Sequence, residues 1–324
     1  GRTPPPSDEP DGALEGAPTE NTTPSQPVAR ALGVQPILAN AVLAGGVLRR
    51  AASPAQKQQW LQPLIAGELQ ATLAFHEPHS RYDLAAIRTV AKRSGDTWTL
   101  NGAKGVVPNG GNAGLLIVPA RTSGADTAKE GVTLFAVAAD AAGVTARDYA
   151  TVDGRRAAEI ALDDVRVDTS AVLGEIDGGY ESLAATIDDA TLAISAEAVG
   201  IMQVLTEKTV EYTKNRIQFG VPISSFQALQ HRMVDMLTAC EQSYSLLLWA
   251  AMAASDRSAD AQRAVSAIKY QVGTAGRKVG QEAVQLHGGM GVTWELDVAH
   301  YFKRLTVIGQ TFGGADWHLD KLAT

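Results

Sequence analysis

Two stretches of the sequence, NRIQFGVPISSFQALQH at residues 215–231 and QLHGGMGVTWE at residues 285–295, decide how the rest of the chain is interpreted. Both lie between helical patterns and carry residues suited to a phosphate-rich ligand. Arg216 has a planar, permanently charged guanidinium group that can bond a diphosphate bidentately. Gly220 tolerates a positive φ and Pro222 cannot continue a helix, so we predict that a helix ends near Arg216.

The second stretch ends its helical pattern in glycines. Gly288, Gly289 and Gly291 let another molecule approach the backbone closely, and Gln285 lies one helical turn before the first two. In the first stretch, Gln227 offers both a donor and an acceptor in the first turn of the next helix. Each stretch alone is also what an ordinary turn between helices contains, because glycine and proline punctuate any helical chain. Their combination is more specific.

Length and composition restrict the class of protein. A chain of 324 residues is long enough for two or three domains with a sizeable core. A hydrophobic content of 45% is typical of a soluble globular protein. The net charge of −7 disfavours nucleic acid as a partner, because a polyphosphate duplex is bound chiefly through lysine and arginine.

The single cysteine and the hydropathy pattern indicate the cellular compartment in which the protein is expected. Cys240 has no second cysteine to pair with, which fits a reducing cytosol, and its neighbours at helical spacing indicate core packing. The longest apolar run, residues 246–254, is too short to cross a bilayer, and the N-terminal residues lack a signal-peptide pattern. We therefore expect a cytoplasmic protein with no membrane partner.

The pattern of the chain predicts an α+β protein in four segments. Residues 1–28 are rich in Pro, Gly, Ser and Thr and are expected to be mobile or extended. Residues 29–69 are a short helical region in which Ser53 can cap a helix. Residues 70–173 alternate in short stretches separated by turn residues, which predicts a small antiparallel β-barrel. Residues 174–324 show apolar stripes at helical spacing and predict an antiparallel four-helix bundle. Its helices are expected at residues 179–213, 224–255, 259–287 and 304–322.

The two opening stretches closely resemble the acyl-CoA dehydrogenase family, whose third domain carries R-x-x-F-G-x-P-I-x-x-F-Q and, further on, Q-x-x-G-G-x-G. The residues that match are Arg216, Phe219, Gly220, Pro222, Ile223, Phe226, Gln227, Gln285, Gly288, Gly289 and Gly291. The resemblance covers roughly residues 30–324. It implies that FAD is the cofactor and that an acyl-CoA thioester is oxidised at its α and β carbons. The N-terminal helical domain of the family is longer, so this chain is expected to be shortened there.

The resemblance also implies a cofactor site formed between subunits. In the family, one subunit holds the flavin ring and its neighbour supplies the matched elements to the ADP end. The residues of this chain expected to bind FAD in that way are Arg216, Phe219, Gln227, Gln285, Gly288 and Gly289.

The family removes the α proton with a glutamate that usually precedes Gly-Thr in the last helical region. This chain reads Thr311, Phe312, Gly313 and Gly314 there, so Phe312 or Gly313 replaces the base, and neither can accept a proton. In some branches of the family the glutamate lies on the first bundle helix instead.

The corresponding position on the first bundle helix falls near Ala190, next to Asp188 and Asp189. An aspartate is one methylene shorter than a glutamate, and such a displacement costs orders of magnitude in rate. The alternative interpretation is an acidic face near the start of a helix.

Other positions of the ring and substrate pocket are changed as well. In place of the family's T-E-P-G-A-G-S-D, the chain keeps Glu77, Pro78 and Asp83 but has His79, Arg81 and Tyr82 where small residues are usual. In place of W-I-T-N it has Val106, Val107, Pro108 and Asn109, and Thr191 replaces an arginine near the CoA moiety. We therefore expect that the chain has lost its own catalytic cleft.

These observations favour a non-catalytic subunit in a hetero-oligomer, α2β2, that completes FAD sites for a homologous acyl-CoA dehydrogenase subunit. Bacterial dehydrogenases of steroid side-chain CoA thioesters are built in this way. A homo-oligomeric dehydrogenase that uses Asp188 or Asp189, and an assembly scaffold without flavin, are the alternatives. His76 and His79 are three residues apart on a strand-to-loop stretch, and we expect no metal there.

Overall fold

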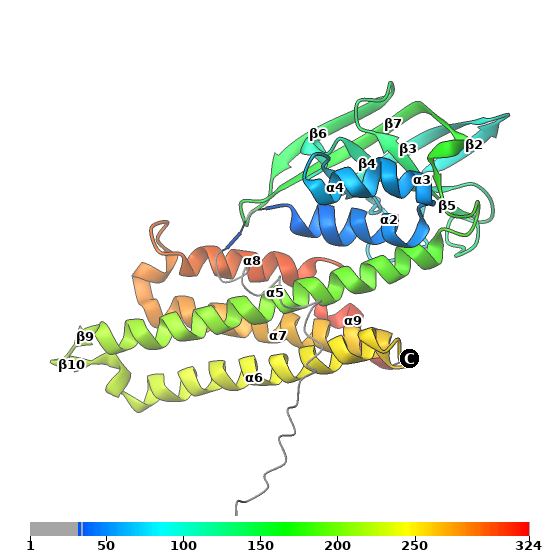
Figure 1. Cartoon of the computed structure of the whole chain (residues 1–324). Coiled ribbons are helices and arrows are strands. Elements are labelled where there is room, and N and C mark those ends of the chain that lie inside the picture. Colours follow the sequence, from blue (N-terminus) through cyan, green and yellow to red (C-terminus); the bar gives the residue numbers. More distant parts are fainter. Residues whose placement is uncertain (1–31, 34, 324) are drawn as a thin grey trace, which may run out of the picture.

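The computed structural model describes residues 32–33 and 35–323 of the chain. The segment 1–28, which is expected to be mobile or extended, lies outside the described residues. Figure 1 shows a β domain at one end of the molecule, a group of short helices beneath it, and long helices that form the rest.

Short helices occupy the first part of the described chain and pack between the sheet and the long helices (Figure 1). They are η1 (Leu38–Ala44), α2 (Gly45–Ala51), α3 (Pro54–Gln56), η2 (Lys57–Leu61) and α4 (Gln62–Ala66). The predicted cap at Ser53 is confirmed: its hydroxyl accepts a hydrogen bond from the Gln56 amide, and its own amide donates to the Gln56 side chain. Pro54 occupies the first helical position, where an N–H is not needed.

Eight strands form a single sheet. They are β1 (Ala71–Leu73), β2 (Val90–Ser94), β3 (Thr97–Pro108), β4 (Leu115–Arg121), β5 (Val132–Ala138), β6 (Val144–Ala150), β7 (Arg156–Asp168) and β8 (Val172–Leu173). Two single-turn helices, η3 (Gly110–Asn112) and η4 (Thr169–Ala171), lie in the connections. The strand order is β6-β7-β3-β2-β4-β5-β8, and β1 pairs with β4.

The sheet differs from the expected antiparallel barrel in two respects. β1 and β2 each pair with β4 in parallel. Among the described strands, β6 and β8 at the two ends of the order do not pair with each other, so the sheet does not close. Alternating apolar stretches predict that strands form, but they do not specify which edges meet.

Long helices form the rest of the chain. They are α5 (Tyr180–Asn215), α6 (Gln227–Ser255), α7 (Ala261–His287), α8 (Val298–Gln310) and α9 (Ala315–Ala323). A small hairpin of β9 (Ile217–Gln218) and β10 (Val221–Pro222), followed by the turn η5 (Ile223–Ser225), joins α5 to α6. The turn η6 (Gly288–Val292) follows α7. The first three predicted bundle helices are confirmed.

The fourth predicted helix, at residues 304–322, is wrong in form because two helices, α8 and α9, take its place. Thr311–Gly314 separates them, and φ is 60° at Phe312 and 122° at Gly313. No right-handed helix can continue through such angles.

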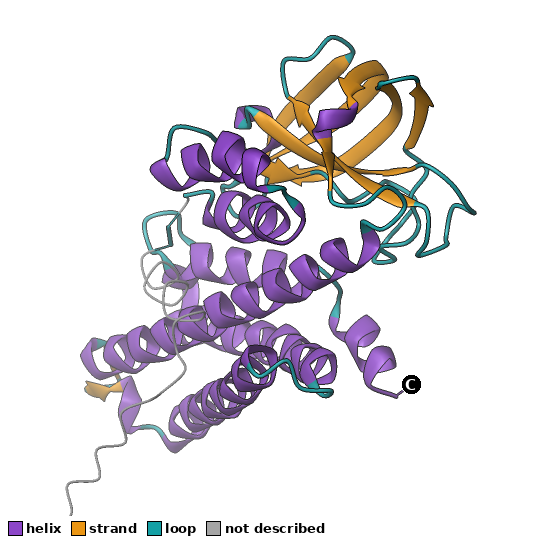
Figure 2. Ribbon diagram, turned by 45° about the vertical axis from the view of Figure 1, so that its right-hand side comes forward, coloured by secondary structure: helices purple, strands orange, loops and turns teal. Residues whose placement is uncertain are grey.

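The α+β class, with a sheet domain before a helical domain, is confirmed, and Figure 2 shows the two as separate layers. The bundle has its own buried core, which includes Leu205, Met236 and Ile268. A second core joins the short helices to one face of the sheet, and Phe312 packs against both cores. Among the described helices, none is long and apolar enough to span a membrane.

Candidate functional site

The two stretches that carry the family resemblance meet at one end of the bundle. α5 ends there, α6 begins there and α7 ends there, beside the β9–β10 hairpin (Figure 1). The ring of Tyr212 in the last turn of α5 stacks on His287 at the end of α7, with the ring centroids 4.3 Å apart. Burial lowers the pKa of His287, whose Nδ1 lies 2.8 Å from the Ala283 carbonyl oxygen. This contact holds the second stretch against the end of α5, three residues before the first stretch begins.

The predicted end of the helix near Arg216 is confirmed, and the backbone there is well ordered by hydrogen bonds. The Arg216 amide donates to the Tyr212 carbonyl at 2.9 Å, and the Arg216 carbonyl accepts from the Ile223 amide at 2.8 Å. The next residues turn through Phe219 and Gly220, both at positive φ. The chain therefore projects from the bundle as a short hairpin.

All residues expected to bind the cofactor are exposed at this end of the bundle. They are Arg216, Phe219, Gln227, Gln285, Gly288 and Gly289. Phe219 is 92% exposed, which is unusual because contact between a large aromatic side chain and water is unfavourable. Within the described part of the chain, no ion pair includes Arg216, so its guanidinium is available to a ligand.

The glycines after α7 divide into open and closed positions. A Cβ atom at Gly288 or Gly289 would meet no other atom within 4 Å. At Gly291 it would lie 2.5 Å from the Val284 carbonyl oxygen. The backbone at the first two glycines is therefore accessible from outside, whereas the third is a close contact within the protein.

These features together can bind an anionic ligand of extended shape. An exposed guanidinium, two amide side chains and accessible backbone are the groups that hold a diphosphate. Phe219 beside them offers an aromatic face, and its ring centroid lies 6.2 Å from that of Phe226 in an edge-to-face arrangement. The residues present fit the ADP end of FAD.

The corner at Thr311–Gly314 is where the resembled family carries its base. At Gly313 a Cβ atom would lie 2.6 Å from both His318 Nε2 and Trp317 Cε3. Of the two positions considered for the base, Phe312 is therefore the one with room for a side chain. Its ring lies 6.0 Å from that of Phe75, centroid to centroid.

Two buried side chains bond the backbone of this corner. Lys269 of α7 donates to the carbonyl of Gly313 at 2.7 Å and to that of Gly309 at 3.3 Å. His318 Nε2 lies 3.1 Å from the Phe312 carbonyl oxygen and therefore donates to it. Burial lowers the pKa of Lys269 to about 8. Burial and then the Lys269 charge lower the pKa of His318 to about 3.

Sequence reasoning missed Lys269. The sequence feature that could have identified it is its position on the buried stripe of α7, four residues after Val265 and three before Val272. A lysine at such a position must either reach solvent or find internal acceptors.

The positions that replace the family's flavin-ring residues offer little to a ligand. Val106 is 55% exposed and lies at φ 49°, where the β3–β7 register is irregular. The Pro108 carbonyl accepts a hydrogen bond from the Thr72 hydroxyl, so it is used within the sheet. Thr191 is buried and donates to the Ile187 carbonyl one turn earlier in α5. None of these three groups replaces an aromatic ring, a free hydroxyl or a cation.

Glu77, which is kept from the family's T-E-P-G-A-G-S-D stretch, is part of a buried ion pair. Its carboxylate lies 2.7 Å from Lys104 Nζ and accepts hydrogen bonds from the Thr89 hydroxyl and the Arg88 amide. Burial alone would raise the pKa of Glu77, but Lys104 and these donors lower it below its ordinary value. Glu77 therefore holds the loop after β1 to the sheet. Lys104 was missed, because its partner is remote in sequence.

Asp188 and Asp189 point to different neighbours. Asp189 pairs with Arg50 at 2.6 Å and with Arg49 at 3.2 Å. Asp188 accepts a hydrogen bond from the Gln262 side chain at 3.3 Å, and burial raises its pKa. Burial therefore gives Asp188 the raised pKa that a general base needs.

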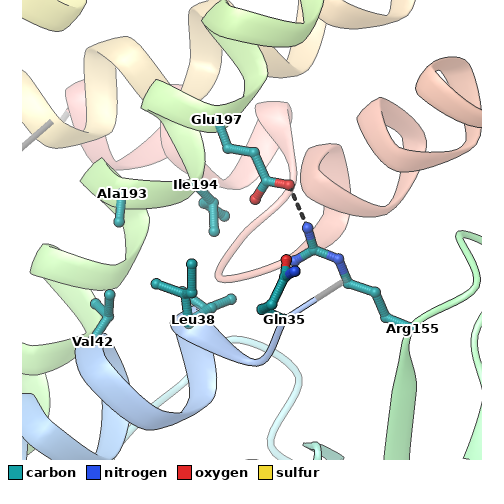
Figure 3. Close-up of a pocket in the computed structure, with 8 residues that line it drawn as sticks. Gln35, Leu38, Val42, Arg155, Ala193, Ile194 and Glu197 are labelled. Carbon is teal, nitrogen blue, oxygen red and sulfur yellow. Dashed lines mark hydrogen bonds and ion pairs between the residues drawn. The ribbon is translucent and has the colours of Figure 1, made fainter. Parts of the chain in front are cut away.

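A buried network of four charges joins the β domain to the bundle. Arg304 of α8 bonds both Glu197 of α5 and Asp153 of the β6–β7 turn, and Arg155 bonds Glu197 as well. Figure 3 shows the Arg155–Glu197 pair at the edge of a small pocket that Gln35 also lines. The cavity measures about 30 Å³, which is room for about one or two water molecules and far too small for a substrate.

The described residues contain no group of three or more His, Cys, Asp or Glu side chains that could hold a metal ion. His79 Nδ1 lies 3.8 Å from the Glu77 carboxylate. The pKa of His76 is lowered, chiefly by burial.

Comparisons with known proteins agree with this architecture. The family model "Acyl-CoA dehydrogenase, middle domain" matches residues 72–165, and "Acyl-CoA dehydrogenase, C-terminal domain" matches residues 177–323. The mitochondrial short-chain specific acyl-CoA dehydrogenase of Homo sapiens is 30% identical over 268 residues. That alignment covers 81% of this chain and 65% of the human protein. The chain thus spans less than two thirds of that relative's length.

Two solved structures are similar along nearly the whole chain. Butyryl-CoA dehydrogenase from Megasphaera elsdenii is 26% identical, with a TM-score of 0.88, and the match covers 96% of this chain and 82% of that one. A structure described as "Tcur3481-Tcur3483 steroid ACAD G363A variant" is 30% identical, with a TM-score of 0.82. The match covers 94% of this chain and 79% of that one.

Proposed function

This chain belongs to the acyl-CoA dehydrogenase family, whose cofactor is FAD, and we propose that it is the non-catalytic subunit of an α2β2 member. In this role it completes the FAD site of a homologous partner subunit. The partner supplies the glutamate that removes the α proton of an acyl-CoA thioester. The observation that carries the proposal is the corner at residues 311–314, where a phenyl ring stands in the one position with room for a base.

The absence of a carboxylate at Phe312 matters because the reaction of the family needs a base that removes a proton. The α proton of a thioester is weakly acidic, so its removal needs a positioned base, which contributes roughly 10²- to 10⁴-fold to the rate. A phenyl ring has no group that binds a proton. The bonds from Lys269 and His318 are made to backbone carbonyls, so neither side chain substitutes for the missing carboxylate.

The exposed end of the bundle supports the second half of the proposal. Arg216, Gln285 and the open backbone at Gly288 fit a diphosphate, as argued above. FAD, when bound, accepts the hydride from the β carbon. The residues of this chain hold and orient the far end of the cofactor, and the partner's cleft holds the ring. The relative described as "Tcur3481-Tcur3483 steroid ACAD" carries a double designation, which also supports a two-chain assembly and a steroid thioester as substrate.

One observation favours a second candidate function, a homo-oligomeric dehydrogenase. Burial raises the pKa of Asp188, as a general base requires. Asp189 does not support this candidate equally, because it is paired with Arg50. An assembly scaffold without flavin is the third possibility, and it predicts no role for Arg216.

Expression of the chain alone and together with a homologous full-length acyl-CoA dehydrogenase separates the three functions. The proposal predicts a colourless chain that forms a yellow, active complex only with the homologue. A yellow and active complex of the chain by itself would establish the homo-oligomer. Protein that never restores flavin to any homologue would establish the scaffold. Flavin absorbance near its visible maximum and dehydrogenation of a CoA thioester are the two measurements.

A further inference from the structure

Side chains of the loop after β1 reach across to the corner between α8 and α9. The Phe75 and Phe312 rings lie 6.0 Å apart at an angle of 37°. Phe312 also packs against both the bundle core and the core beneath the sheet. It is therefore wedged at the junction of the two domains.

A second contact spans the same junction a few residues away. The Tyr82 and Trp317 rings lie 5.7 Å apart at 57°. The Tyr82 hydroxyl also donates to the side-chain oxygen of Gln310, the last residue of α8, at 3.4 Å. Tyr82 is one of the bulky residues that stand where the family has small ones. Two aromatic contacts therefore bridge the loop to the corner.

The corner is held in this position by its own buried bonds. Phe312 lies at φ 60°, a strained conformation for a non-glycine residue that persists where its surroundings determine it. Those surroundings are Lys269, which bonds the Gly313 carbonyl, and His318, which bonds the Phe312 carbonyl. Donors from α7 and α9 thus fix the two peptide groups on either side of Gly313, directly after the strained residue.

We propose that Phe312 and Tyr82 close the junction between the β domain and the bundle to an acyl thioester, and that Lys269 and His318 position them by fixing the corner. Phe312 thus leaves this chain without a base at that position, and its ring also excludes the ligand. The inference rests on the proposed function, since it identifies the excluded ligand as the thioester that the partner subunit binds. It goes further because it names the residues that prevent binding in this chain.

Titration of the full chain with octanoyl-CoA tests the exclusion. The wild-type chain is expected to bind it at least about tenfold more weakly than the double variant Phe312→Ala/Tyr82→Ser. Tyr244→Ser, which changes an exposed tyrosine of α6, is the matched control and should behave as wild type. Equal binding by wild type and double variant, or no binding by either, would overturn the proposal. The chain is titrated alone, so the result does not depend on whether it restores flavin to a partner.

Hydrogen exchange tests the positioning role and remains informative if the double variant does not fold. In Lys269→Met, the amides of residues 311–314 are expected to exchange at least about tenfold faster than in wild type, because their carbonyl anchor is lost. The amides at the hairpin end of α7 should keep their rates. An unchanged rate at the corner, or a uniform increase along α7, would contradict a local clamp.

Discussion

Lys269 carries an ammonium group into the protein interior, where its described partners are carbonyl oxygens. Its pKa falls to about 8 in the folded chain, from an ordinary value of 10.5. Between these two values the unfolded chain binds more protons at this residue than the folded chain does. The free energy of unfolding therefore rises as the pH rises from 8 towards 10.5, and the cost of the buried cation is fully present below pH 8.

Lys269→Met should remove this component of the pH dependence. We expect the stability of the wild type relative to the variant to increase by about 1.6 kcal/mol between pH 8 and pH 9.5, since the limiting slope is roughly 1.4 kcal/mol per pH unit. Urea denaturation of both proteins at three pH values measures it. Parallel pH profiles would show that the ammonium does not titrate in this range.

Glu77 gives a second prediction at the scale of one residue. Glu77→Gln leaves Lys104 fully buried without a counterion, and the expected loss in the free energy of unfolding is about 3–5 kcal/mol. Glu159→Gln is the control, because Glu159 forms an ion pair of the same 2.7 Å length with Arg147 on the surface. Exposed pairs contribute about 0–1 kcal/mol. Equal losses in the two variants, measured by urea denaturation, would be the contrary result.

At the scale of single residues, the features that could be predicted are those that depend on neighbouring residues in the sequence. The helix end at Arg216 and the cap at Ser53 follow from residues a few positions away, and both are observed. The partners of Glu77 and Lys269 lie far along the chain, so no local pattern indicates these pairs. The resemblance identified Glu77 only as a residue kept in a stretch of the family's pocket, without a partner.

The turn η6 allows a prediction at the scale of an element. Gly291→Ala places a Cβ atom 2.5 Å from the Val284 carbonyl oxygen, so the turn must move. We expect a loss of about 1–3 kcal/mol in the free energy of unfolding, as for other overpacked sites. Gly289→Ala meets open space and should leave stability unchanged while lowering the FAD content of the mixed complex.

Thermal denaturation and flavin absorbance together check this pair of variants. A stable Gly289→Ala complex with full flavin would contradict the assignment of Gly289 to the FAD site. A Gly291→Ala protein as stable as wild type would show that the turn adapts without strain.

Whole elements were predictable where one periodicity continued without interruption. The apolar stripes of α5, α6 and α7 predicted these helices, because each stripe must face the common core. The fourth stripe predicted one helix where there are two, since the break depends on Lys269, which lies outside the stripe, and on the bond that His318 makes back to the Phe312 carbonyl. The barrel was expected from strand spacing alone, and closure is decided by contacts between edges that spacing does not encode.

At the scale of the whole molecule, the two candidate sites lie at opposite ends of α8. Its first residues follow η6, next to the exposed hairpin end, and its last residue precedes the Phe312 corner. The ion network of Arg304, Glu197, Asp153 and Arg155 holds the middle of α8 and α5 to the β domain. The fold therefore keeps an open end for a cofactor and a filled junction in a single rigid arrangement. This asymmetry is the reason to assign the chain to a mixed complex.

The FAD content of the mixed complex, prepared with Arg216→Ala in this chain, tests the account most directly. Arg263→Ala, which changes an exposed arginine in the first turn of α7 at the other end of the bundle, is the control. The account predicts that Arg216→Ala lowers the FAD bound per complex by about tenfold at limiting FAD, since a charge-assisted contact of more than about 1.4 kcal/mol is lost, while the control complex keeps its flavin. Full flavin occupancy in the Arg216→Ala complex would contradict it.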